Sequence, residues 1–78
     1  KKLGHHDYLV SARADPAMLA EKLGLTLPGK GSYDTLSGFI LEFAHEIPAP
    51  GTTIEVEGIK FTIQRATPQV IQEVQIRW

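Results

Sequence analysis

The clearest hydrophobic pattern in the chain is a period-two alternation between residues 53 and 66. Ile54 and Val56 alternate with polar residues, and Ile59, Phe61 and Ile63 do the same after a short break. Strict alternation is typical of strands with one buried face. The break is Glu57-Gly58, and Gly58 can supply the positive φ that a two-residue hairpin loop needs. The segment is therefore predicted to form a β-hairpin.

The last nine residues, VIQEVQIRW, also alternate, but with one change of phase. Val74, Ile76 and Trp78 share one face, whereas Ile71 falls on the other parity. A β-bulge near Gln72 or Glu73 would return Ile71 to the core face. We predict a third strand here, separated from the hairpin by a turn over residues 67–69.

A different period marks the stretch from about Thr35 to His45, which we predict to be a helix. Apolar residues recur at the i, i+3, i+4, i+7 and i+8 spacing of an amphipathic helix, at Leu36, Phe39, Ile40, Phe43 and Ala44.

The ends of this helix are marked by residues with known terminal preferences. Asp34 is expected to be the N-cap, with Thr35 as the first helical residue or as an alternative cap. Pro48 forbids continuation of the helix, and PAPG, from Pro48 to Gly51, has the composition of a turn.

The first third of the chain is more weakly patterned. Residues 7–12, DYLVSA, are predicted to form a first strand, and a short helix is expected over Ala17–Leu23, because Asp15 is a good N-cap and Pro16 suits the first helical position. Gly24 is placed to end this helix in a left-handed conformation. Its apolar face is expected to comprise Met18, Leu19 and Leu23, and residues 26–32 have the composition of a loop.

The predicted element order is β-α-α-β-β-β. A sheet with one apolar face needs a cover, and the two helices supply it. We therefore expect an α+β two-layer sandwich in which two helices pack on a mixed or antiparallel sheet of four strands. The 78 residues are expected to form one domain, 1–78.

The composition of the chain argues against several classes of function. The net charge is −1, so there is no strong field to attract nucleic acid or an anionic membrane. There is no cysteine, which rules out disulfides and thiolate metal sites, and no apolar run is long enough to span or insert into a bilayer. The chain starts without methionine and stops inside a predicted strand, which favours a piece of a longer polypeptide.

Several residue sets could carry chemistry, and each has a simpler structural interpretation. Asp34 and Thr35 could mark an anion site at a helix N-terminus, but Asp34 can satisfy those N–H groups itself. Gly38 destabilises a helix interior by about 0.5–1 kcal/mol. Close approach of a strand or of another chain is the expected reason, and a ligand near the backbone is the alternative.

The histidines raise the question of metal binding or hydrolysis. Glu42 and His45 have the Glu-x-x-His spacing of carboxylate-bridged metal bundles, but the further ligands of such a site are missing. Ser37 and His45 are about 12 Å apart along one helix, too far to act as nucleophile and base with Asp34. His5, His6 and Asp7 lie on an extended segment, where neighbouring side chains point to opposite sides. We therefore predict no catalytic, cofactor-binding or metal-binding residue.

The remaining polar and aromatic candidates lie in the C-terminal strands. Lys60, Arg65 and Arg77 are interpreted as residues of solvated strand faces. Trp78, if exposed, would indicate a packing partner.

With this order of elements in place, the chain closely resembles the CorC/HlyC transporter-associated domain. The resemblance extends from about Tyr8 to Ile76, and is strongest in YDTLSGFILEFAHEIPAPGTTIEVEGIKFTIQRA and the later VIQEVQI. The residues that carry it are Asp34, Thr35, Leu36, Gly38, Ile47, Pro48, Gly51, Gly58, Phe61 and Ile71. Six of them, Asp34, Thr35, Gly38, Pro48, Gly51 and Gly58, are taken as its structural motif.

The resemblance implies a context. Such domains lie at the C-terminal end of larger proteins, after a pair of CBS modules and often behind a membrane domain linked to magnesium or cobalt efflux, and some relatives are called hemolysins. It implies a regulatory appendage on the cytoplasmic side, with a fold similar to part of a FAD-binding domain and no catalytic residues to transfer. Two positions depart from the family: His6-Asp7 replaces an Asp-Gly turn, and PQVIQ lacks a basic pair.

The expected function is that of a non-enzymatic accessory domain without a cofactor. Its expected partners are the CBS modules and membrane domain of a parent protein, or a second copy in a homodimer. The alternative is a sensing module for a nucleotide or small anion, bound in a groove between Gly38 and the sheet.

Overall fold

One antiparallel sheet carries the fold in the computed structural model, which describes residues 1–28 and 33–78. The elements follow the order β-β-α-α-β-β-β over these ranges. Their bounds are β1 Lys2–Gly4, β2 Asp7–Ser11, α1 Pro16–Leu23, α2 Leu36–Ala44, β3 Thr53–Val56, β4 Ile59–Ala66 and β5 Ile71–Arg77.

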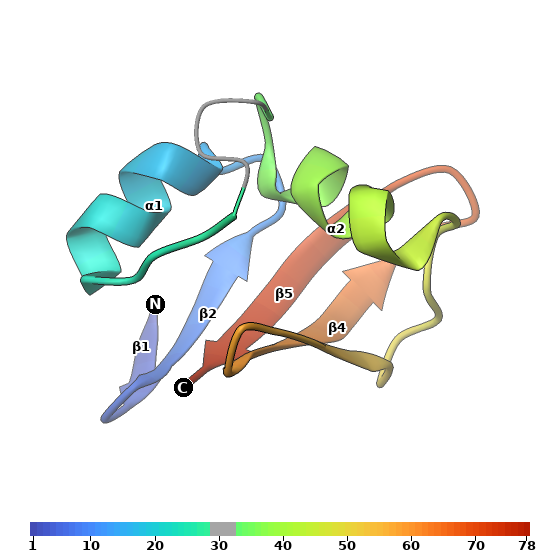
Figure 1. Ribbon diagram of the computed structural model, residues 1–78. Coiled ribbons are helices and arrows are strands. Elements are labelled where there is room, and N and C mark those ends of the chain that lie inside the picture. The colour runs from blue at the N-terminus through green and yellow to red at the C-terminus, as the bar shows by residue number, and fades with distance from the viewer. Residues whose placement is uncertain (29–32) are drawn as a thin grey trace.

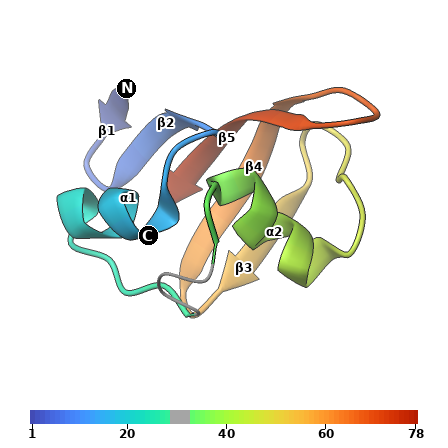
Figure 2. The same ribbon diagram turned by 90° about the horizontal axis from the view of Figure 1, so that it is seen from above.

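The last strand lies in the middle of the sheet. The strand order is β1-β2-β5-β4-β3, with every neighbouring pair antiparallel. Both helices cover the same face of this sheet, α1 toward β2 and α2 toward β4 and β3 (Figures 1 and 2). Among the residues that the structure describes, no helix lies over the opposite face (Figure 1). The predicted α+β two-layer architecture is therefore confirmed, and the sheet is antiparallel rather than mixed.

The predicted strand count is wrong, because the described residues form five strands rather than four. The extra strand, β1, pairs Lys2 with Tyr8 and Gly4 with Asp7, and the Leu9 amide donates to the Lys1 carbonyl at 2.7 Å. Its three residues, Lys-Leu-Gly, have no apolar alternation and are mostly exposed. Backbone pairing alone defines this strand, and such pairing leaves no signal in a hydrophobic pattern.

The predicted hairpin is confirmed. Val56 pairs with Ile59, so Glu57 and Gly58 are the two loop residues. Both have positive φ, 50° and 83°, as a type I′ turn requires. The PAPG turn comes just before β3: Gly51 has a φ of 92°, and its amide donates to the Ile63 carbonyl at 2.7 Å.

The predicted bulge is also present, and it has a counterpart on the neighbouring strand. The register runs Ile63↔Val74, Arg65↔Glu73 and Ala66↔Ile71. Between these pairs β4 has one extra residue, Gln64, and β5 has one extra residue, Gln72. The two insertions compensate each other, and Ile71 is only 1% exposed as a result.

The core lies between the helices and the covered face of the sheet. It contains Ala12, Ala20, Leu27, Leu36, Phe39, Ile40, Val56, Ile59, Phe61, Ile63, Ile71, Val74 and Ile76. The predicted helix faces need correction: Met18 is 61% exposed and Phe43 is 40% exposed. The fully buried residues of α1 are Pro16 and Ala20, whereas the predicted Leu19 is partly buried against the core.

The caps of α1 are as predicted. The Asp15 carboxylate accepts a hydrogen bond from the Ala17 amide at 2.9 Å, Pro16 is the first helical residue, and Gly24 ends the helix with a φ of 70°. The loop predicted over residues 26–32 is confirmed for 26–28. Its other residues, 29–32, lie outside the described part of the chain.

The uncovered face of the sheet is held by polar cross-strand contacts. Gln75, on the central strand, donates to the Asp7 carboxylate at 2.8 Å and accepts from Gln64 at 2.8 Å. The hydroxyls of Thr53 and Thr62 are 2.9 Å apart. These contacts satisfy polar side chains of four strands, and they stabilise the face of the sheet that no helix covers.

Candidate functional site

The N-terminus of α2 was considered as an alternative anion site, and the amides of its first helical residues already have partners within the chain. The Thr35 hydroxyl accepts from the Gly38 amide at 3.1 Å, and the Thr35 carbonyl from the Phe39 amide at 3.1 Å. The Leu36 and Ser37 amides donate to the Ala14 and Ala12 carbonyls at 2.8 and 2.9 Å. The amides of residues 36–39 are therefore not free for an anion, which argues against the anion-binding alternative for this helix end.

The predicted cap, Asp34, is wrong, and the alternative, Thr35, is the N-cap. Asp34 is exposed and lies one residue before the cap. Aspartate and threonine are both good N-caps, so composition could not choose between them. Thr35 becomes the cap because the first amides of the helix donate to the carbonyls of Ala12 and Ala14.

Replacing Thr35 with alanine is expected to lower the free energy of unfolding by about 1 kcal/mol, within the usual range for loss of an N-cap. The matched change Asp34→Ala should stay within about 0.5 kcal/mol of the parent, because that side chain is exposed. Urea unfolding of the two variants measures the difference. A larger loss for Asp34→Ala than for Thr35→Ala would contradict the assignment of the cap.

Gly38 has no close neighbour on the sheet. A Cβ added at this position would meet only the Thr35 hydroxyl, at 3.5 Å, which is an ordinary van der Waals distance. The predicted close approach of a strand is therefore wrong. The other predicted reason, approach of a second chain, is not tested by a single chain and remains a prediction.

Gly38→Ala is expected to stabilise the isolated domain by about 0.5–1 kcal/mol, since alanine is the better helix former and the space is available. Thermal or urea unfolding of the monomeric domain measures this. Unchanged or lower stability would mean that the helix backbone at this position depends on glycine itself.

The C-terminal end of α2 does not assemble a metal or catalytic site. His45 is the C-cap, with a φ of 67°, and its amide donates to the Leu41 carbonyl at 2.8 Å. The helix therefore ends before Pro48 forces it to. Ser37 and His45 lie at opposite ends of the helix. Within residues 1–28 and 33–78, no group of three His, Cys, Asp or Glu side chains could hold a metal ion.

Glu42 interacts with Tyr33 rather than with His45. The Tyr33 hydroxyl donates to the Glu42 carboxylate at a long 3.4 Å, and the ring meets Phe39 edge-on at 5.5 Å. Partial burial of the phenol, and then the nearby Glu42 charge, raise the pKa of Tyr33 above its usual value near 10.0. A phenol whose pKa is raised by folding stabilises the fold below pH of about 10, and this stabilisation is lost as pH rises further.

Glu42→Gln is expected to lower the pKa of Tyr33, because it removes the neighbouring negative charge. Ultraviolet titration of phenolate absorbance measures the shift. Glu46→Gln removes an equal charge from an exposed position just past the helix and should leave the titration curve unchanged. Equal shifts in both variants would show a general charge effect instead of the Tyr33–Glu42 contact.

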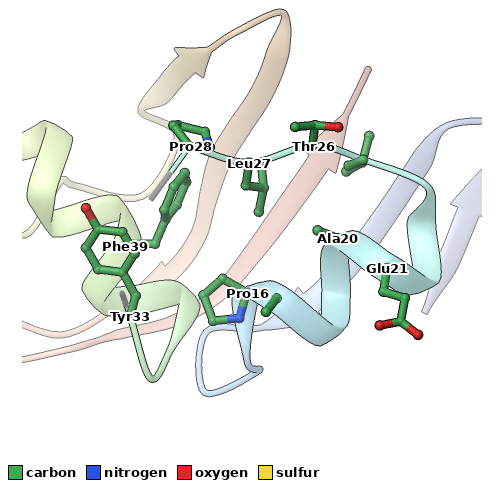
Figure 3. Close-up of a pocket in the computed structure, with 10 residues that line it drawn as sticks. Pro16, Ala20, Glu21, Thr26, Leu27, Pro28, Tyr33 and Phe39 are labelled. Carbon is green, nitrogen blue, oxygen red and sulfur yellow. The ribbon is translucent and has the colours of Figure 1, made fainter. Parts of the chain in front are cut away.

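A small hollow lies between α1, the segment 25–28 and the start of α2 (Figure 3). Its volume is about 150 Å³, and apolar side chains such as Pro16, Ala20, Leu27 and Phe39 form much of its wall. Ligand sites usually enclose about 300–1,000 Å³, so this hollow is small for a nucleotide. Leu36, Phe39 and Ile40 fill the space between α2 and the sheet, which argues against a ligand groove beside Gly38.

The histidines near the N-terminus stack with aromatic rings instead of converging with Asp7. The His5 and His6 ring centroids are 3.9 Å apart, His6 stacks on Trp78 at 4.9 Å, and Tyr8 stacks on Trp78 at 5.7 Å. Asp7 points to the uncovered face, where it accepts from Gln75. Trp78 is half-buried, whereas Lys60, Arg65 and Arg77 are exposed as predicted.

No helix in the described ranges is long and apolar enough to cross a membrane. Comparison with known proteins gives the broader context. The model of the CorC_HlyC family, the transporter associated domain, matches residues 1–78. Hemolysin C of Rickettsia prowazekii is 30% identical over 79 residues, covering 99% of this chain and 26% of that protein. The chain thus spans about a quarter of the length of such relatives.

Solved structures agree on the fold. The transporter associated domain of a CBS domain protein from Porphyromonas gingivalis is 28% identical, with a TM-score of 0.82 over 99% of this chain and 93% of that one. A domain from Neisseria meningitidis, assigned provisionally to a Mg²⁺ and Co²⁺ transporter (CorC), is 16% identical, with a TM-score of 0.86 over 97% and 93% of the two chains. From these matches, the chain belongs to the CorC_HlyC family of transporter-associated domains.

Proposed function

We propose that this domain is a non-catalytic regulatory part of a larger membrane protein that contains a CBS pair. That protein would be linked to Mg²⁺ or Co²⁺ efflux, or would be a relative of the hemolysins. Residues 1–78 would be its C-terminal domain, on the cytoplasmic side. The match of the transporter-associated family model to residues 1–78 carries this proposal. The CBS domain protein of Porphyromonas gingivalis and the longer hemolysin C of Rickettsia prowazekii support the context.

The proposed mechanism is coupling between contacts and transport state. The domain would pack differently against the CBS modules, or against a second copy, in different states of the transporter. Coupling of this kind needs a differential contact energy of about 1–3 kcal/mol.

The helix layer offers groups for such contacts. Met18 on α1 is 61% exposed, and Phe43 on α2 is 40% exposed. Gly38, also on α2, is only half-buried and has no strand packed against its Cα. A module that packs on this layer would cover both apolar side chains and the backbone at Gly38.

Hydrogen exchange of the full-length parent protein, with and without Mg²⁺, tests this mechanism. The amides of α1 and α2 are expected to differ in protection between the two conditions. The isolated domain is the control, and its exchange should not respond to Mg²⁺. Identical exchange of both helices in the parent protein under both conditions would contradict coupling through this layer.

A further inference from the structure

Two cationic side chains lie directly opposite each other on the uncovered face of the sheet. Lys60 on β4 pairs with Arg77 on β5 in the Cα register, and both side chains are exposed. Directly opposed residues on one face of an antiparallel pair are close neighbours, and like charges in such a pair are destabilising. A domain with a net charge of −1 has no general excess of cations to explain this pairing.

Each cation of the pair also has a carboxylate opposite it on the strand at its other side. Asp7 is the register partner of Arg77, and Glu55 is the register partner of Lys60. Asp7, however, accepts its hydrogen bond from Gln75 at 2.8 Å. Within the described residues no carboxylate lies within 4.0 Å of either cationic group. Neither cation is therefore held in a close ion pair within the described residues, and both keep N–H donors for an anion from outside the chain.

The Lys60–Arg77 pair lies beside a hollow whose other lining residues are Gly58 and Trp78. Lys60, Arg77, Gly58 and Trp78 line an open hollow of about 380 Å³ at the end of the sheet. The indole of Trp78 is stacked with His6 and Tyr8, and its amide donates to the His6 carbonyl at 3.2 Å. Gly58 has no side chain, and a Cβ there would meet nothing within 4 Å, so the turn leaves the hollow open.

We propose that this hollow binds a phosphate group. A guanidinium presents a planar fork of N–H donors that matches phosphate oxygens, and an ammonium adds a compact positive charge. A bound dianion would also remove the repulsion between Lys60 and Arg77, so that ligand binding stabilises the fold. Free phosphate compounds and phospholipid headgroups share this chemistry. The site does not depend on the coupling role proposed above.

Trp78 is the only tryptophan in the chain and is one of the residues that line the hollow, so its fluorescence serves as a probe of binding. The isolated domain is titrated at constant ionic strength with inorganic phosphate, and separately with phosphatidylcholine vesicles with or without phosphatidic acid. We expect a saturable fluorescence change and a higher melting temperature with phosphate. Binding of phosphatidic acid vesicles as well would identify a lipid headgroup as a ligand, and binding of free phosphate alone would identify a soluble one.

The double variant K60Q/R77Q is expected to weaken binding at least about tenfold, which corresponds to loss of one charge-assisted hydrogen bond. Without phosphate its melting temperature should equal or exceed that of the parent, because the opposed charges are gone. The control R13Q/R65Q removes two exposed arginines that do not line the hollow and should retain binding within about twofold. Absence of saturable binding, or equal weakening in both double variants, would overturn the proposal.

Discussion

Phe61→Ala is expected to remove a large share of the stability of the domain. Phe61 is 0% exposed in β4, one strand from the edge of the sheet, and its ring contacts that of Phe39 on α2 at 5.6 Å. Truncating a buried phenylalanine costs about 3–5 kcal/mol. A domain of 78 residues has a total stability of roughly 4–12 kcal/mol. Urea unfolding followed by circular dichroism measures the loss.

Phe43→Ala is the matched control, because it makes the same chemical change on the surface. Phe43 also packs against Phe39, at 5.1 Å, but it is 40% exposed. Its truncation should cost far less, about 1 kcal/mol or below. Comparable losses in the two variants would show that the helix layer, rather than the covered face of the sheet, holds most of the stability.

Ile71→Ala is expected to cost about 2–5 kcal/mol, as for other buried isoleucines. The residue is 1% exposed, and it reaches the core only because Gln72 is an extra residue in β5. Without the bulge, simple alternation from Val74 would place Ile71 on the uncovered face. The loss in urea unfolding therefore tests the bulge directly.

Val70→Ala is the control for this second change. Val70 is the neighbouring residue, but it is 45% exposed in the turn before β5. Its truncation is expected to change stability by no more than about 0.5 kcal/mol. A cost for Ile71→Ala as small as that for Val70→Ala would mean that Ile71 is not in the core in solution.

The elements with a strong period or an unambiguous cap were predictable from sequence. The hairpin at Glu57-Gly58, the bulge at Gln72 and the caps Asp15 and Gly24 are local features. Each depends on the chemistry of a few adjacent residues, so sequence is sufficient to place them.

The errors in the predicted fold have tertiary causes. β1 is made by backbone pairing of exposed residues, which no side-chain period reveals. Thr35 is the cap of α2 in place of Asp34, since Ala12 and Ala14 hold the following amides. Met18 was placed in the core by its chemistry, yet the docking of the short α1 buries Pro16 and Ala20.

The candidate phosphate site could not be predicted from the sequence, for a related reason. Lys60 and Arg77 are distant in the chain, and each looks like an ordinary residue of a solvated face. They become neighbours only through the register of β4 and β5, which pairs Lys60 with Arg77 across the two strands. Alternation predicts which face a residue occupies, but it does not predict its cross-strand partner.

The regulatory role is tested most directly by divalent-cation efflux from cells that produce the parent protein, with residues 1–78 either present or deleted and both forms produced at equal levels. If the domain is an accessory regulator, the deletion form still transports, but the dependence of its efflux rate on cytoplasmic Mg²⁺ is altered. Complete loss of efflux would contradict an accessory role. An unchanged dependence on Mg²⁺ would contradict a regulatory one.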